Sequence, residues 1–139
     1  MSRIEGIINW FESCPLVSEA GYIDVNQLDA QTQALGLYKQ PAMDVIELID
    51  GSKIITENYY LLFRRAAQLK EDRFDNESYL EAVEDWFEQQ QYAENYPDIG
   101  YPVSDIAMSN ATYMLERDST DATYQLTLTI EYERKVSND

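Results

Sequence analysis

The chain has 139 residues, of which 26 are Asp or Glu and 10 are Lys or Arg, and it contains no histidine. Its formal charge of −16 at pH 7 argues against a surface for nucleic acid or anionic membranes, because both would be repelled. The lack of histidine removes the commonest general base and the commonest metal ligand. We therefore expect a binding or assembly protein, not an enzyme, with no cofactor, no membrane association and no tight binding of nucleic acid.

The length fits one domain over residues 1–139, and an apolar content of 45% is normal for a globular protein. The single cysteine, Cys14, can form neither an internal disulfide nor a zinc site alone, so we expect a small buried side chain. No stretch approaches the ~18 apolar residues of a membrane span, which predicts a soluble protein. The eleven tyrosines suit either a half-buried sheet or a protein interface.

The first element expected is a helix over residues 3–13. Ser2 and Glu5 have the spacing of a capping box, in which each side chain binds the other's backbone. Pro15 ends the helix, because proline disfavours helical dihedral angles at the residue before it. Apolar side chains recur after the cap at intervals of three and four, as on one face of a helix: Ile4, Ile7, Ile8 and Phe11.

A hairpin is expected in the next part of the chain. Its strands, residues 45–49 and 53–67, are rich in β-branched and aromatic side chains and flank Asp50-Gly51. Asp-Gly accepts the positive φ angles of a type I′ turn, which joins two strands tightly. Apolar residues become continuous after Asn58, so we expect that half of the strand to be covered on both faces. Two weaker extended segments are expected before the hairpin: residues 22–25 and 35–38.

A second helix is expected over residues 72–92, with Asp75 or Asn76 capping its start. Its apolar face combines side chains at helical spacing: Tyr79, Leu80, Val83, Trp86 and Phe87. Its opposite face is acidic: Glu77, Glu81, Glu84, Asp85 and Glu88. Residues 71–98 hold ten acids and one base, Arg73, so more than half of the net charge lies here.

A loop over residues 96–102 leads to a second hairpin, with a strand at 106–116, a turn at 118–121 and a closing strand at 124–132. The closing strand alternates between apolar and polar side chains, which predicts one face on a core and the other in water. A free edge of this strand could pair with a neighbouring subunit. The candidate contact residues lie on its outer face and in the loop: Thr127, Thr129, Glu131, Tyr96 and Tyr101.

The order helix, hairpin, helix, hairpin predicts one α+β domain, in which an antiparallel sheet from two hairpins carries two helices packed on one face. No glycine-rich phosphate loop occurs among the five scattered glycines. Carboxylate pairs such as Glu84 and Asp85 could hold a divalent cation for hydrolysis, but adjacent residues on a helix point apart. The acidic face could also repel passing DNA, imitate DNA toward a basic host protein, or simply keep the protein soluble.

Four stretches are distinctive in their order and spacing: residues 4–16 (IEGIINWFESCPL), Asp50-Gly51, residues 85–90 (DWFEQQ) and residues 122–132. Together they resemble the tail-terminator-like minor capsid (minor tail) proteins of siphophages and of prophages in Gram-positive bacteria. The resemblance implies an α+β subunit that forms a homo-oligomeric, hexamer-type ring, stops growth of the tail tube and docks to the head connector. It implies a place in the virion, and in the host cytoplasm during assembly.

Proteins of this group sometimes carry the label chloramphenicol resistance protein. Acetyl transfer to chloramphenicol, as known in the acetyltransferase family, uses a histidine base, and this chain has none. We therefore assign no catalytic, cofactor-binding or metal-binding residue. The alternative from another class is an acidic DNA mimic that inhibits a host nucleic-acid-binding protein, suggested by the acidic run at 71–98.

Overall fold

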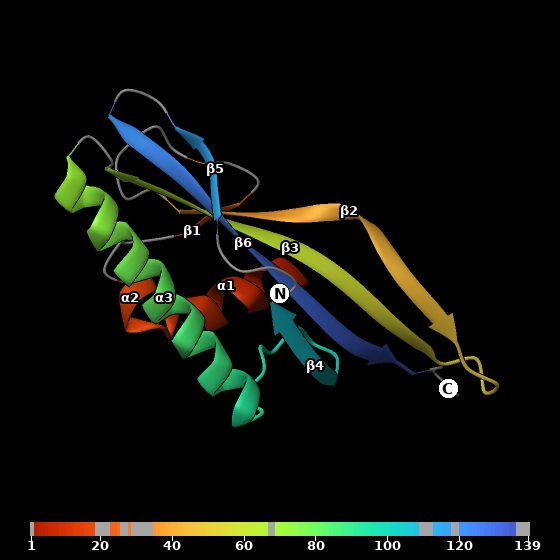
Figure 1. The fold of residues 1–139 in the computed structure, drawn as a ribbon. Helices are drawn as coiled ribbons and strands as arrows, with labels where there is room; N and C mark the ends of the chain where they lie inside the picture. The colour runs from red at the N-terminus through yellow and green to blue at the C-terminus, as the bar shows by residue number, and fades with distance from the viewer. Residues whose placement is uncertain are drawn as a thin grey trace.

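The computed structural model describes residues 2–18, 23–25, 28, 35–66, 69–108, 113–117 and 120–135. The fold within these ranges is mixed α+β, with few helices and a mostly antiparallel sheet of six strands (Figure 1). No helix in the described part of the chain is long and apolar enough to cross a membrane. The elements in chain order are α1 (Arg3–Glu12), α2 (Pro15–Ser18), β1 (Ile23–Val25), β2 (Leu35–Glu47), β3 (Lys53–Ala66), α3 (Lys70–Tyr92), β4 (Val103–Met108), β5 (Tyr113–Arg117) and β6 (Asp121–Arg134).

The sheet has the strand order β1-β2-β3-β6-β4, and β5 also pairs with β6. β3 and β6 pair along their whole length, from Lys53 opposite Arg134 to Ala66 opposite Asp121. β4 and β5 share the other side of β6, next to its C-terminal and N-terminal halves respectively. All these pairs are antiparallel, but β1 runs parallel to β2. The expectation of a purely antiparallel sheet is therefore wrong at β1.

The second hairpin differs from its prediction. The single strand expected over residues 106–116 is two strands, β4 and β5, and residues 109–112 between them lie outside the described ranges. The closing strand begins at Asp121 and is longer than expected. Among the described strands, β6 has β3 on one side and β4 with β5 on the other, so the expectation of a free edge along this strand is wrong where these pairs run.

The first hairpin is confirmed, but its turn is not of type I′. Gly51 has a φ of 88°, and no other residue of this turn has a positive φ, whereas type I′ needs two. The Gly51 N–H donates to the carbonyl of Leu48 at 2.9 Å, and the Leu48 N–H donates to Ser52 at 2.7 Å. The loop therefore has three residues, with glycine in the left-handed position. The strand register also shifts between Lys39 and Met43, a segment that includes Pro41, which has no N–H to donate to the ladder.

Helix α1 begins where the sequence predicts. The Glu5 N–H donates to Oγ of Ser2 at 3.3 Å, which satisfies one of the free amides of the first turn. Pro15 does more than end α1, because it is the first residue of the short helix α2, a favoured place for proline. Cys14, between the two helices, is fully buried as predicted, and burial raises the pKa of its thiol.

Helix α3 starts at Lys70, two residues before the predicted start. Neither Asp75 nor Asn76 caps it; Oδ2 of Asp72 accepts instead from the Leu69 N–H at 3.0 Å. Asn76 is buried in the second turn and donates to the carbonyl of Ala66 at 2.8 Å, which ties α3 to the end of β3. The predicted apolar face is confirmed, with the central side chains buried and two aromatic side chains half-buried beside them: Leu80, Val83 and Phe87, then Tyr79 and Trp86.

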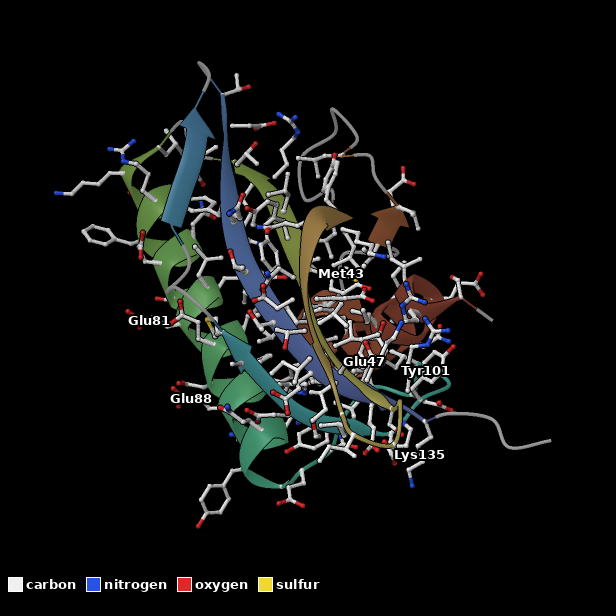
Figure 2. The ribbon with its side chains drawn as sticks, turned by 90° about the vertical axis from the view of Figure 1, so that its right-hand side faces the viewer. Met43, Glu47, Glu81, Glu88, Tyr101 and Lys135 are labelled. Carbon is white, nitrogen blue, oxygen red and sulfur yellow. The ribbon has the colours of Figure 1, made fainter. Side chains whose placement is uncertain are left out.

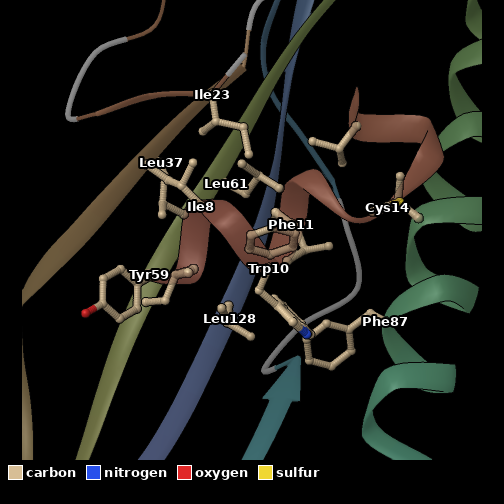
Figure 3. Close-up of a cluster of buried hydrophobic side chains, with 14 of the residues drawn as sticks. Ile8, Trp10, Phe11, Cys14, Ile23, Leu37, Tyr59, Leu61, Phe87 and Leu128 are labelled. Atoms are coloured by element: carbon tan, nitrogen blue, oxygen red, sulfur yellow. The ribbon is translucent and has the colours of Figure 1, made fainter. Parts of the chain in front are cut away.

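One hydrophobic core joins α1, α3 and the inner face of the sheet (Figure 3). The Trp10 ring centroid lies 4.9 Å from that of Trp86 and 5.9 Å from that of Phe87, so α1 and α3 meet through aromatic rings. Sheet residues on the core side alternate along each strand and are nearly inaccessible, among them Leu61 and Leu128.

The outer face of β6 is less exposed than its alternating pattern predicts. Thr123, Gln125 and Thr127 are only 6–7% exposed, although their side chains lie opposite the core face. On β3, by contrast, Tyr60 and Leu62 remain half-buried, so the expectation that both faces would be covered after Asn58 is wrong there.

Candidate functional site

A buried carboxylate lies on the core side of β3. Glu57 is 1% exposed and shares its strand face with Ile55 and Tyr59, so it would be costly to bury without partners. Oε2 of Glu57 accepts a hydrogen bond from the Tyr59 hydroxyl at 2.6 Å, and Oε1 accepts one from the hydroxyl of Tyr132 on β6. Both hydroxyls come from neighbouring positions on the sheet, which fixes the orientation of the carboxylate.

Two cations complete this Glu57 centre. Nε of Arg3, in the first turn of α1, lies 3.0 Å from Oε1, and Nζ of Lys39 on β2 lies 3.5 Å from Oε2. Burial alone would raise the pKa of Glu57, but the two hydroxyl hydrogen bonds and the two positive charges outweigh it, and the pKa is lowered. Burial and the adjacent carboxylate raise the pKa of Tyr59 and of Tyr132. The carboxylate is therefore ionised and the phenols are protonated at neutral pH.

A pocket of about 470 Å³ opens beside the Glu57 centre. Four chain segments form it: the start of α1, the middle of β2, the middle of β3, and the loop before β4. The Tyr101 ring stacks on Tyr132, with centroids 5.4 Å apart, and the Arg134 guanidinium lies 5.3 Å from the Tyr101 centroid. The lining residues are Ser2, Arg3, Ile4, Lys39, Tyr59, Ile99, Gly100 and Tyr101.

The end of the β2–β3 hairpin carries a second unusual surface. In Figure 1 the two strands extend together beyond α3 to the turn at residues 48–52. Along this hairpin end five large apolar side chains are 37–109% exposed, and they point to both faces of the sheet because Met43 and Ile46 are an odd number of residues apart. Exposed apolar side chains gathered at one place are typical of contact surfaces, so the hairpin end is a candidate contact surface. Its residues are Met43, Val45, Ile46, Leu48 and Ile49.

One row of paired residues crosses four strands of the sheet, from β2 to β4. Asp44 on β2 is opposite Thr56, which is opposite Glu131, which is opposite Asp105 on β4. Among the strands that the structure describes, β1 pairs only with Leu35–Leu37, and β4 pairs only with β6. In this band no described strand therefore lies on the outer side of β2 beyond Lys39 or of β4, although Nε2 of Gln91 on α3 donates to the Ile106 carbonyl of β4 at 2.7 Å. β2 and β4 run in opposite directions, because each successive pair from β2 through β3 and β6 to β4 is antiparallel.

The acidic face of α3 is solvated. Glu77, Glu81, Asp85 and Glu88 are all exposed, and Figure 2 shows Glu81 and Glu88 pointing away from the sheet. A helix of 23 residues is about 34 Å long, so these charges form an extended row. In the described ranges, no three His, Cys, Asp or Glu side chains are grouped in a way that could hold a metal ion.

The five candidate contact residues do not form one surface. Thr127 is buried at 7%, so it offers little to a partner. Thr129 donates to Oδ1 of Asn58 at 2.7 Å, and the Glu131 carboxylate accepts from Oγ of Ser104 at 2.8 Å, so both are engaged within the sheet. Half-buried Tyr96 and Tyr101 pack against the core from the loop before β4. A contact role for these residues stays a prediction, strongest for Tyr101 because it lines the pocket.

The sequence interpretation missed Glu57, its two cations and the exposed hairpin end. A signal for Glu57 was present, since alternation places it on the same face as Ile55 and Tyr59, and an acid on an apolar strand face needs partners. Its partners come from α1 and β2, at positions that strand and helix patterns do not relate. The hairpin end has the β-branched composition of a buried strand, so composition alone could not show that helix cover stops before it.

Comparison with models of known protein families finds no match, and comparison with curated protein sequences finds no significant match.

Proposed function

We propose that this protein is a structural subunit of a phage tail, of the tail-terminator or head–tail completion type. In this role it caps the tail tube by assembling into a ring and docks to the head connector, within the virion and, during assembly, in the host cytoplasm. The resemblance of four sequence stretches to this group supports the assignment. The protein acts by contact, and the Glu57 centre serves to fix α1 on the sheet, not to transfer protons.

The observation that carries this proposal is a pair of sheet edges, on β2 beyond Lys39 and on β4, with which no further described strand pairs. A ring needs a heterologous interface, in which one surface of a subunit binds a different surface of the next. Because β2 and β4 run in opposite directions at the same height, β4 of one copy beside β2 of the next would continue the antiparallel alternation. Each subunit would then extend the sheet of its neighbour.

The exposed hairpin end would add hydrophobic contact to this edge pairing. Full burial of one aliphatic side chain contributes about 1.5–3 kcal/mol, and five such side chains lie between Met43 and Ile49. Two terms oppose assembly: the charge of −16 on each copy, and Asp44 facing Asp105 of the neighbour in an unshifted register. Isolated subunits should therefore associate weakly, and a tail-tube end that holds them together should favour the closed ring.

Sedimentation velocity and negative-stain imaging of the purified chain, with and without matching tail tubes, test the proposal. We expect association that strengthens as salt screens the negative charges, and discrete caps on tube ends. A chain that stays monomeric at all salt concentrations and leaves tube ends bare would contradict it.

A DNA mimic is the second candidate, favoured by the exposed acidic row on α3. This function predicts capture of a basic host protein that free DNA displaces. The variant Glu81→Gln/Glu88→Gln should lose that capture, because it removes two exposed charges of the row. Recovery of tail or connector proteins instead, insensitive to DNA, would support the structural role.

A further inference from the structure

The Glu57 centre holds one more positive charge than negative. Arg3 and Lys39 each carry a full positive charge, and the one carboxylate between them supplies a single negative charge. The side chains of Arg3 and Lys39 are 32% and 33% exposed, whereas that of Glu57 is 1% exposed. One face of the cation pair is therefore bound to Glu57, and the other is accessible from solution.

That accessible face opens into the pocket of about 470 Å³. Both cations line the pocket, together with the Ser2 hydroxyl and the Tyr101 ring that carries Arg134. Figure 2 shows Tyr101 close to α1. Two carboxylates are bound beside the pocket: Asp98 accepts from the Gly100 N–H at 3.1 Å, and Oε1 of Glu5 accepts from the Ser2 hydroxyl at 3.2 Å. The two charged residues that line the pocket are both cations, which is a local exception on a chain of net charge −16.

We propose that this pocket binds a single carboxylate group between Arg3 and Lys39. An ionised carboxylate would restore the balance of two cations and two anions, and guanidinium and ammonium groups both form strong hydrogen bonds to carboxylate oxygens. The overall negative field of the protein disfavours ligands of high charge, so a monoanionic group is preferred over phosphate. The carboxylate is that of a small organic acid or of an acidic side chain from a second copy of the chain.

Amide chemical shifts measured at constant ionic strength test the proposal, with acetate replacing chloride. We expect saturable shifts at Ser2, Arg3, Ile4, Gly100 and Tyr101, with a dissociation constant of about 1 mM. Inorganic phosphate at the same ionic strength should bind more weakly. No saturable shift at these amides, or stronger binding of phosphate than of acetate, would overturn the proposal.

Three variants test whether Lys39 contributes to carboxylate binding. Lys39→Gln should weaken acetate binding about tenfold, because one hydrogen bond to a charged group is lost. Lys39→Arg keeps the charge and should keep the binding, and Lys53→Gln, which changes an exposed lysine at the start of β3, should bind like the wild type. Unchanged binding in Lys39→Gln would overturn the assignment.

The source of the carboxylate is identified by dilution. If a second copy supplies it, the same amides should shift as the protein is concentrated, and acetate should reverse that shift. If a free acid supplies it, the pocket amides should respond to acetate alone. Both outcomes support the carboxylate site, and neither depends on ring formation.

Discussion

Nε of Arg3 lies 3.0 Å from Oε1 of Glu57, a contact that ties the first turn of α1 to the middle of β3. The hydrophobic side chains of α1 bury it against the sheet, but apolar packing tolerates small shifts along the helix axis. A charge contact at the very start of the helix removes that freedom. The position of α1 in turn shapes the pocket, since Ser2, Arg3 and Ile4 all line it.

Replacing the buried carboxylate should destabilise the fold. Glu57→Gln leaves Arg3 and Lys39 without their counter-charge, and we expect a loss of about 2–4 kcal/mol in the free energy of unfolding. Urea unfolding followed by tryptophan fluorescence measures this, because Trp10 is buried in the core. Glu47→Gln, at an exposed position on β2, is the matched control and should change stability by less than about 0.5 kcal/mol. Equal stabilities for the two variants would show that the centre contributes nothing.

Two tyrosines should ionise last as the pH is raised. Burial and Glu57 raise the pKa of Tyr59 and of Tyr132 in the folded protein, whereas an unfolded tyrosine titrates near pH 10. Above that pH the unfolded state binds fewer protons than the folded state, so the free energy of unfolding falls as the pH rises. We expect tyrosinate absorbance at 295 nm to leave at least two of the eleven tyrosines protonated until unfolding begins. Tyr59→Phe and Tyr132→Phe should each remove one late-titrating group; unaltered late absorbance in both would refute the assignment.

Gly6 marks a close contact between α1 and the loop before β4. A Cβ atom at this position would lie 2.0 Å from the carbonyl oxygen of Asp98, a backbone atom that cannot turn aside. Gly6→Ala should therefore destabilise the protein by about 1–3 kcal/mol, despite the higher helix propensity of alanine. Glu12→Ala, at an exposed position of the same helix, should be nearly neutral. A Gly6→Ala variant at least as stable as the wild type would place α1 farther from this loop.

Substitutions at the exposed hairpin end should weaken self-association and leave the free energy of unfolding nearly unchanged. The double variant Ile46→Thr/Ile49→Ser removes two apolar side chains that are 61% and 109% exposed. It adds no charge, and threonine suits a strand while serine suits a turn. We expect at least a tenfold weaker association by sedimentation, with the urea midpoint nearly unchanged. Phe74→Ser, at a 63% exposed position on α3, removes apolar surface elsewhere and should associate like the wild type. Equal weakening in both variants would indicate unspecific hydrophobic contact.

Local signals predicted much of this fold. The Ser2 cap, the periodic apolar residues of α1 and α3, the burial of Cys14 and the first hairpin all depend on neighbours within a few positions, and the structure contains each of them. Where a turn depends on one extra residue, as at Gly51, the pattern gave the hairpin but the wrong turn type.

Long-range pairing was less accessible to sequence reasoning. The place of β6 inside the sheet, the division of the expected strand into β4 and β5, and the partners of Glu57 all depend on residues far apart in the chain. Alternation along β6 shows which side chains share a face, but it does not show what lies beside the strand. The candidate contact residues on β6 were therefore placed on a strand that other described strands flank on both sides.

Disulfide trapping tests head-to-tail edge pairing most directly. Asp44 and Asp105 lie in one row of the sheet, and in an unshifted head-to-tail pair their Cα atoms would be about 4.5–5.5 Å apart, within the range of about 4.4–6.8 Å found in disulfides. The native Cys14 is buried and should not react. Mild oxidation of a mixture of Asp44→Cys and Asp105→Cys chains should give dimers that contain one chain of each kind. Oxidation that gives no such dimers, or only dimers of like chains, would contradict the account.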